Sequence, residues 1–133
     1  TNTYHKQKYS LNPLEFTCIN NLYTQKSYNY FYGVSALKNT DTELNSLIKV
    51  NLSDLTTVKY WHEEDCYSGE PAFIAKPNAQ NEDDGILISI VGNLANKSSF
   101  ILILDATSFN EISRIQLPHM LPFGLHGGFY PIN

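Results

Sequence analysis

The sequence predicts an all-β fold made of short antiparallel strands. Aromatic residues are abundant, with nine Tyr, seven Phe and one Trp in 133 residues, and aromatic side chains favour the half-buried surface of a pleated sheet. Apolar segments recur at intervals of about ten residues and are separated by polar turns, whereas no segment shows a convincing helical period. This pattern is typical of a sandwich, a barrel or a propeller, and the pattern alone leaves all three open.

The individual strands are predicted from apolar alternation and from the turns between them. Residues 14–19 alternate apolar and polar side chains, and an aromatic strand after the next polar turn pairs with them as a hairpin. Pro71 forces an extended conformation on Glu70 and introduces a further strand. Two strands are apolar on both faces and are therefore predicted to be central and fully buried. The predicted strands cover residues 14–19, 28–33, 46–52, 56–61, 72–75, 86–91, 99–104 and 111–117, the sixth and seventh being the two fully apolar ones.

Charge and composition restrict the classes of function. The net charge is −4, with nine Lys and Arg against thirteen Asp and Glu, so no electrostatic footprint for nucleic acid is present. The longest apolar run, residues 100–104, is too short to span a bilayer, and no basic amphipathic helix is present to bind a membrane surface. Cys18 and Cys66 lack Cys-x-x-Cys spacing and are predicted to be reduced, buried or half-buried thiols. We expect a cytoplasmic protein, with peripheral membrane contact made by segments outside this chain.

One stretch near the end of the chain, residues 117–129, carries the candidate chemistry. Its prolines fix φ at two positions, and three glycines flank His126, so the backbone can take a tight path that presents one uncrowded imidazole. On composition alone, a single histidine beside glycines is more often a turn or cleft residue than a metal ligand. Single glutamates such as Glu15 and Glu70 are, in the same way, most often solvated carboxylates at strand ends.

Four ordered blocks of the sequence resemble the carotenoid cleavage oxygenases. The last block reads Leu-Pro-His-x-x-Pro-Phe-Gly-x-His-Gly and is similar to the terminal signature of that family. The four blocks are residues 14–20, 69–74, 82–89 and 117–127. Because they follow in the family's order over nearly the whole chain, their combination is far more specific than any one block.

The resemblance implies a fold and a metal site. Members of this family are seven-bladed β-propellers with a non-haem Fe(II) on the central axis, held by four histidines and oriented by three glutamates. Residues 1–133 would form the C-terminal part of the propeller domain, its last blades, with residues 1–13 as a linker or trimmed end. His126 falls on the last iron-binding histidine, and Glu15 and Glu70 fall on two of the supporting glutamates. We expect Glu70 to pair with His126, and Glu15 with a histidine that this chain does not contain.

Other side chains near the signature are assigned different roles. The resemblance makes Phe123 and Leu125 candidates for the wall of a substrate tunnel. Leu125 replaces the usual aromatic residue, and Thr17 replaces a proline that is frequent in animal members, so both changes concern substrate range. His119 is interpreted as structural, and neither His62 nor His5 matches a family ligand.

The implied activity is oxidative cleavage of a double bond in a carotenoid or apocarotenoid by O2, giving aldehydes such as retinal. Retinoid isomerisation or isomerohydrolysis at the same iron centre is the related alternative. A non-enzymatic β-domain that binds an apolar ligand or a protein partner is the competing class. Since even a catalytic zinc site uses three protein ligands, one histidine cannot hold a catalytic iron. We therefore expect a C-terminal fragment of a longer enzyme, inactive alone.

Overall fold

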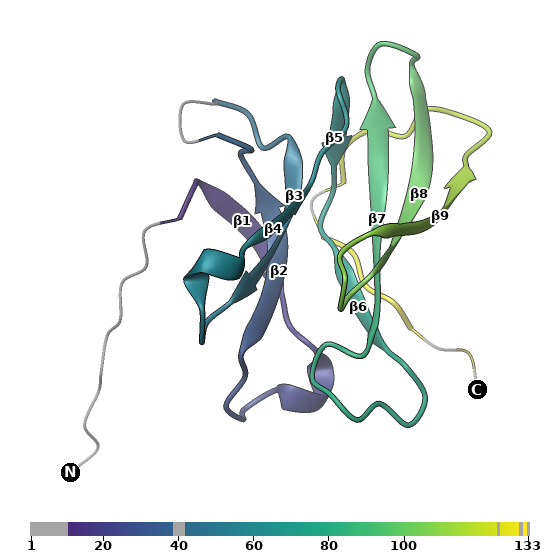
Figure 1. The fold of residues 1–133 in the computed structure, drawn as a ribbon. Coiled ribbons are helices and arrows are strands. Elements are labelled where there is room, and N and C mark those ends of the chain that lie inside the picture. The colour runs from purple at the N-terminus through teal and green to yellow at the C-terminus, as the bar shows by residue number, and fades with distance from the viewer. Residues whose placement is uncertain (1–10, 39–41, 125, 131, 133) are drawn as a thin grey trace.

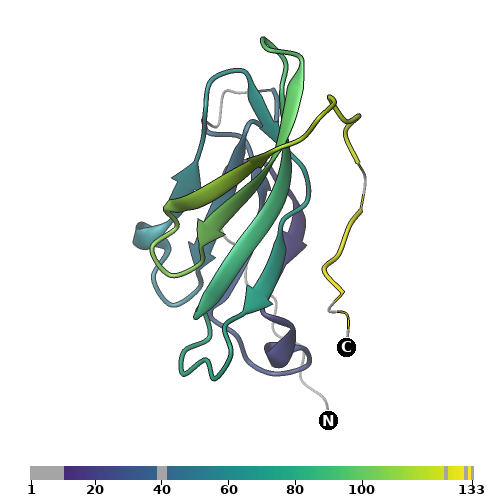
Figure 2. The same cartoon turned by 90° about the vertical axis from the view of Figure 1, so that its right-hand side faces the viewer.

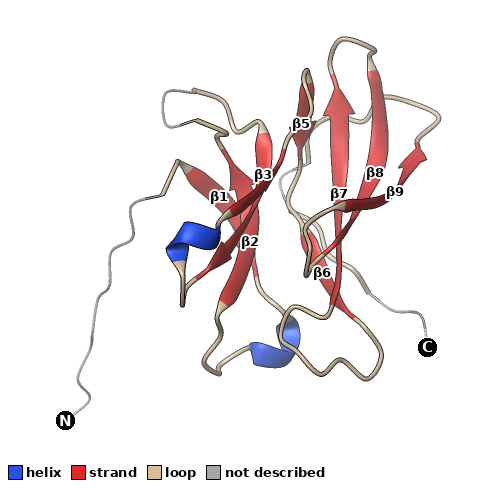
Figure 3. Cartoon of the chain, viewed as in Figure 1, coloured by secondary structure: helices blue, strands red, loops and turns tan. Residues whose placement is uncertain are grey.

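The chain forms two antiparallel sheets that stand face to face (Figure 1, Figure 3). The computed structural model describes residues 11–38, 42–124, 126–130 and 132. The strands are β1 (Leu14–Cys18), β2 (Tyr30–Ser35), β3 (Ser46–Asn51), β4 (Lys59–Trp61), β5 (Cys66–Ser68), β6 (Ala72–Ala75), β7 (Gly85–Asn93), β8 (Ser98–Asp105) and β9 (Glu111–Gln116). Two 3-10 helices, η1 (Asn21–Tyr23) and η2 (Leu55–Thr57), interrupt the connections. Within the described residues there is no α-helix, and no helix is long and apolar enough to cross a membrane.

Each sheet is an up-and-down meander. The first sheet has the order β1-β2-β3-β4. The second has the order β5-β7-β8-β9, and β6 also pairs with β7. β5 pairs with one end of β7 (residues 91–93) and β6 with the other (residues 85–88), so β5 and β6 act as one edge strand with a break between them. This break is where Glu70 lies.

The core lies between the two sheets. The Tyr32 ring of β2 stacks on Phe73 of β6 at 5.5 Å and on Phe109 of the β8–β9 turn at 6.4 Å between centroids. β7 and β8 contribute their inward-facing residues, and the buried cluster comprises Tyr32, Val34, Leu47, Cys66, Phe73, Leu87, Val91, Phe100, Leu102, Leu104, Ala106 and Phe109. Aromatic stacking across the interface therefore holds elements of both sheets together.

Several strand boundaries differ from the prediction. The second strand starts at Tyr30 rather than at residue 28, and the backbone N–H of the preceding Asn29 donates to the Glu82 carboxylate. Residues 55–57 form η2, whose start is capped by Asp54, so the predicted strand 56–61 shortens to β4. β5 was not predicted at all, because three residues are too few to show alternation. The Asn12 side-chain amide donates to Ala36 O just after β2, and the Ser35 hydroxyl of β2 donates to Pro13 O. The packed fold therefore begins before β1.

The prediction that β7 and β8 are buried on both faces was wrong for the outward face. Leu87 and Leu102 point inward and are at most 1% exposed. On the opposite face, Ile90 is 48% exposed, and Ile115, which pairs with Ile101 of β8, is 52% exposed. The physical reason is that the described residues pack a full sheet against one face only. The outward face keeps the apolar composition of a buried surface without that cover.

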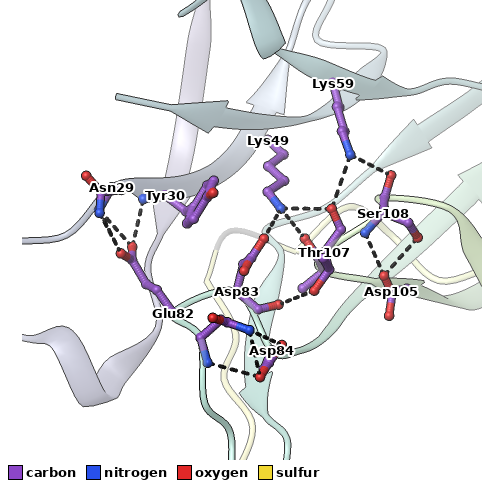
Figure 4. A network of polar contacts seen from close by, with 12 residues as sticks. Asn29, Tyr30, Lys49, Lys59, Glu82, Asp83, Asp84, Asp105, Thr107 and Ser108 are labelled. Carbon is purple, nitrogen blue, oxygen red and sulfur yellow. Dashed lines mark hydrogen bonds and ion pairs between the residues drawn. The ribbon is translucent and has the colours of Figure 1, made fainter. Parts of the chain in front are cut away.

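A buried ionic cluster joins the two sheets, and we call it the clamp (Figure 4). Lys49 of β3 points toward the second sheet, where its Nζ lies 2.6 Å from Asp83 Oδ2, and the two side chains are 5% and 11% exposed. The same ammonium donates to the carbonyl oxygens of Ala106 (2.6 Å) and Thr107 (3.0 Å) and lies over the Tyr30 ring. Every Nζ proton thus has an acceptor, which a buried ammonium requires.

The neighbours of Asp83 extend this connection between the sheets. The Glu82 carboxylate accepts hydrogen bonds from the backbone N–H groups of Asn29 and Tyr30 at 2.7–2.9 Å. Asp84, in contrast, turns back to its own loop and accepts from the N–H of Gln80 at 2.9 Å. Of the three consecutive acidic residues before β7, Glu82 and Asp83 therefore bind the first sheet, whereas Asp84 closes its own loop.

Arg114 links the outer edge of the second sheet to the connection between the sheets, and this link predicts a pH dependence. Its guanidinium hydrogen-bonds to Glu63 and Glu111, each at 2.7 Å, and thereby lowers the pKa of both carboxyl groups. Because the folded pKa values are lowered, the stabilisation is present above the ordinary glutamate pKa of about 4.3 and is lost as the pH falls through the lowered values. Arg114→Gln should therefore lower the free energy of unfolding at pH 7 by at most about 1 kcal/mol, since these groups are partly solvated, and lower it by less at pH 3 than at pH 7.

This prediction is checked by urea denaturation at the two pH values. Lys59→Gln is the matched control, because Lys59 donates to the carbonyl oxygens of Thr107 and Ser108 rather than to a carboxylate. Its effect should be the same at both pH values. An Arg114→Gln effect as large at pH 3 as at pH 7 would show that the guanidinium stabilises by packing on Phe100, over whose ring it lies at 4.4 Å, and not through the carboxylates.

Candidate functional site

The break between β5 and β6 positions Glu70. We call the edge that these two strands form the inner edge of the second sheet. The N–H of Gly69 still donates to Ile90 O at 2.8 Å, and the Ser89 hydroxyl donates to Gly69 O at 2.9 Å. Pro71 then provides no N–H, so the ladder cannot continue through this point. Glu70 consequently leaves the sheet between β5 and β6, and its side chain is 19% exposed.

The segment after β9 brings His126 to Glu70. We call residues 117–124 and 126–130 the strap, which runs from the end of β9 along the inner edge of the second sheet (Figure 2). The first residue of the strap is bound to β8, because the N–H of Leu117 donates to Ser99 O at 2.9 Å. Farther on, the Phe123 ring lies 3.5 Å from where a Cβ of residue 92 would stand and meets Tyr67 edge-on at 6.2 Å. Gly92 thus provides the flat surface over which the ring passes.

One carboxylate oxygen of Glu70 binds the strap at two points. Glu70 Oε2 lies 3.2 Å from His126 Nδ1 and accepts a hydrogen bond from the N–H of Gly127 at 3.0 Å. Because an ionised carboxylate only accepts, Nδ1 carries the proton of a neutral His126 ring, and Nε2 is left with its lone pair. Nε2 makes no hydrogen bond to any residue in the described part of the chain, and the side chain is 71% exposed. The imidazole is therefore oriented as a metal ligand would be.

The first sheet contributes Phe16 to this site. Its ring meets the His126 ring edge-on, with centroids 5.8 Å apart and an interplanar angle of 77°. Phe16 has φ of 50° and lies in a β-bulge, where the register between β1 and β2 shifts. The bulge requires Gly33 on the partner strand, since a Cβ there would come within 2.7 Å of the Leu14 side chain and 2.9 Å of Glu15 O. The edge strand β1 of the first sheet and the inner edge of the second sheet thus meet at His126.

The other predicted site residues lie apart from this pair. Glu15 is exposed on β1 and makes no hydrogen bond or ion pair with any described residue. His119 is exposed on the strap, and His62 Nδ1 lies 2.8 Å from Asn45 O, away from Glu70. Leu125 and His5 lie outside the described residues. The structure therefore brings together Glu70, His126 and the strap bearing Phe123, which lines a cavity with both of them.

The described residues do not provide a complete metal site. Across residues 11–38, 42–124 and 126–130, no three His, Cys, Asp or Glu side chains are grouped so that they could hold a metal ion. Burial and, to a smaller extent, the negative charge of nearby Glu70 raise the pKa of the Cys18 thiol to about 12. The thiol is therefore neutral near pH 7 and is not the thiolate that binds metals. Both cysteines are free, Cys66 buried and Cys18 half-buried, as the sequence predicted.

Three contributors to the site were not indicated by the sequence patterns. Phe16 was assigned to an ordinary alternating strand, Ser99 to a buried strand, and Gly127 to a tight backbone path beside His126. A short-range signal existed only for Gly33, because a glycine within an aromatic strand is typical of a bulge or of a close backbone approach. The contacts of Ser99 and Gly127 span 22 and 57 residues, so no local pattern could reveal them.

Comparisons with known proteins identify the family of this chain. The model of the retinal pigment epithelial membrane protein family matches residues 1–131. The chain is 41% identical over 118 residues to the chloroplastic carotenoid cleavage dioxygenase 8 of Arabidopsis thaliana, covering 89% of this chain and 20% of that protein. It is 39% identical over 111 residues to the mitochondrial carotenoid-cleaving dioxygenase of Homo sapiens, covering 83% of this chain and 18% of that protein.

Solved structures show the same fold. A chimera of ACO and RPE65 superimposes with a TM-score of 0.84 at 28% identity, covering 90% of this chain and 26% of that one. Cobalt-substituted ACO of Synechocystis, an apocarotenoid oxygenase, gives a TM-score of 0.80 at 28% identity, covering 85% and 24%. The two sheets are therefore propeller blades, which confirms the predicted fold class. The chain spans about a fifth of the length of the relatives it matches.

Proposed function

The chain belongs to the retinal pigment epithelial membrane protein family, that of the carotenoid cleavage oxygenases, and we propose that it is the C-terminal part of an iron(II)-dependent oxygenase. The substrate would be a carotenoid or apocarotenoid, and cleavage of one double bond with O2 would give aldehydes such as retinal. The relatives named above are carotenoid-cleaving dioxygenases, which supports this substrate class.

The observation that carries the proposal is the contact between Glu70 and His126. A carboxylate bound to one imidazole nitrogen fixes the tautomer, orients the ring and makes the other nitrogen a better donor. Imidazole nitrogen suits iron, so the donor set fits one ligand position of an Fe(II) site. A solved relative of this fold is cobalt-substituted, which supports a metal site in a protein of this fold.

His126 would hold the metal through Nε2, and Glu70 would keep the ring in place through Nδ1. Iron, when bound, would supply the binding and activation of O2 beside an apolar tunnel. Phe16 stacks edge-on against the imidazole and, with Phe123, would exclude water from that side of the site. Glu15 would orient a histidine provided by another part of the protein.

Two features favour completion of the site by other blades. The outward face of the second sheet exposes Ile90 and Ile115, as expected of a surface that another blade covers. The sheet edges that meet at His126 bear a single metal-ligating histidine among the described residues, whereas a metal centre needs several ligands. The remaining ligands would come from the four-fifths of the relatives' length that this chain does not match.

The test is made on the full-length protein, loaded anaerobically with Fe(II) and supplied with a carotenoid and O2. We expect stoichiometric iron and aldehyde products identified by mass spectrometry, whereas the 133-residue chain alone should retain negligible iron. A retinoid product with changed double-bond geometry and an intact carbon chain would identify the isomerase alternative. Full-length protein that bound the carotenoid but contained no iron would support the non-enzymatic β-domain instead and would contradict the proposal.

A further inference from the structure

We propose that Ser99 is a positioning residue for the metal site, because its hydroxyl fixes the start of the strap so that His126 reaches Glu70. Ser99 lies in β8 and is fully buried, although it faces the outward side of the second sheet. The strap is what covers it. The inference rests on the proposed function, since it concerns retention of the metal that His126 would bind.

The strap is bound to the sheet by polar contacts at two points. At the first, the Ser99 hydroxyl accepts a hydrogen bond from the N–H of Leu121 at 2.9 Å, and Ser99 O accepts from the N–H of Leu117 at 2.9 Å. At the second, Glu70 Oε2 accepts from Gly127 and contacts His126. Between these points, no described backbone N–H of the strap donates to the sheet. The Ser99 hydroxyl is thus the last fixed point before the ligand histidine.

Packing beneath the strap is incomplete, which increases the importance of that hydrogen bond. A cavity of about 140 Å³ separates the strap from the sheet and is lined by Ile90, Gly92, Leu121 and Phe123, among others. Side chains that border a cavity lose part of their van der Waals contacts. Phe123 still packs over Gly92 and against Tyr67, so the cavity reduces the close packing of the strap and increases its dependence on the hydrogen bonds at the two ends.

Loss of the hydroxyl should therefore weaken metal binding without removing a ligand. In Ser99→Ala the Leu121 N–H faces an apolar cavity without its acceptor, so the strap populates other positions. Only the fraction of molecules in which His126 stays on Glu70 binds metal well, and the apparent affinity falls in proportion to that fraction. For one neutral hydrogen bond we expect a loss of about fivefold.

The experiment titrates the full-length protein with Co(II) under anaerobic conditions, against a competing chelator. Ser99→Ala should bind Co(II) about fivefold more weakly, change the intensity of the visible Co(II) absorption bands, and exchange the Gly127 amide hydrogen faster than the wild type. Ser99→Thr keeps a hydroxyl and should restore the affinity. Ser98→Ala is the matched control, because Ser98 precedes it on β8 and makes no side-chain hydrogen bond to the described residues.

Each outcome decides the inference. Wild-type affinity, spectrum and exchange in Ser99→Ala would overturn it while leaving the proposed function intact, whereas a wild-type protein that bound no Co(II) would overturn the proposed function itself. If Ser99→Ala fails to fold, Leu121→Pro removes the same hydrogen bond from the donor side and leaves β8 unchanged. The same loss of affinity is expected there, and unchanged affinity would overturn the inference equally.

Discussion

Replacement of His126 by alanine in the full-length protein is expected to abolish both iron retention and carotenoid cleavage. His126 is the one imidazole in the described chain that a carboxylate orients with Nε2 left unbonded. Loss of one ligand from a metal centre removes both a bond and a charge-stabilising donor, so we expect iron content to fall at least about tenfold, the lower end of what loss of even a supporting residue costs. Iron is measured per chain by mass spectrometry after desalting, and cleavage by release of aldehyde.

His119→Ala is the matched control for this change. His119 lies on the same strap and is exposed, but contacts neither Glu70 nor Phe16. Its replacement should leave iron content and turnover at the wild-type level, and the fold of both variants can be compared by circular dichroism. If His126→Ala kept its iron and its turnover, the oxygenase proposal would be wrong, and the pair with Glu70 would be a structural contact only.

The sequence predicted the architecture well because alternation and turn residues act locally. The segment 72–75 was predicted with both of its boundaries correct, since Pro71 marks the start of β6. The resemblance also led to the expectation that Glu70 and His126 meet, and the structure places them 3.2 Å apart. Their roles as supporting carboxylate and iron ligand stay predictions, as do the roles of Glu15, Phe123 and Leu125.

The parts that could not be predicted depend on contacts between distant segments. Lys49 lies in the apolar run of β3, and its alternation with Ile48 and Val50 resembled that of a half-exposed strand. In the structure both faces of β3 are buried. The Lys49 side chain can be buried because it is paired with Asp83, which lies 34 residues later in the sequence. An ammonium can be buried only when such a partner exists, and the partner is invisible to local patterns. Likewise, the bulge at Phe16 depends on the close approach of β1 to Gly33 of β2, which the local sequence around Phe16 does not reveal.

Replacement of Asp83 by alanine is expected to be among the most destabilising single changes in this chain. It would leave the buried Lys49 ammonium with two carbonyl acceptors and without the carboxylate that is bound to it. Breaking a buried ion pair by removing one partner typically costs about 3–5 kcal/mol. We therefore expect the free energy of unfolding in urea to fall by about that amount, together with weaker association of the two sheets, seen as faster proteolysis in the loop of residues 76–84.

A neighbouring carboxylate and a double variant identify the cause of this loss. Asp84→Ala, in the same loop, removes hydrogen bonds to Gln80 and Asn81 at the surface and should cost much less than Asp83→Ala. Adding Lys49→Met to Asp83→Ala removes the uncompensated charge, so most of the stability should return, although the carbonyls of Ala106 and Thr107 lose their donor. If the double variant were as unstable as Asp83→Ala, the loss would arise from the loop itself rather than from the clamp. Recovery would instead show that the loss in Asp83→Ala comes from the uncompensated charge of Lys49 at the contact between the two sheets.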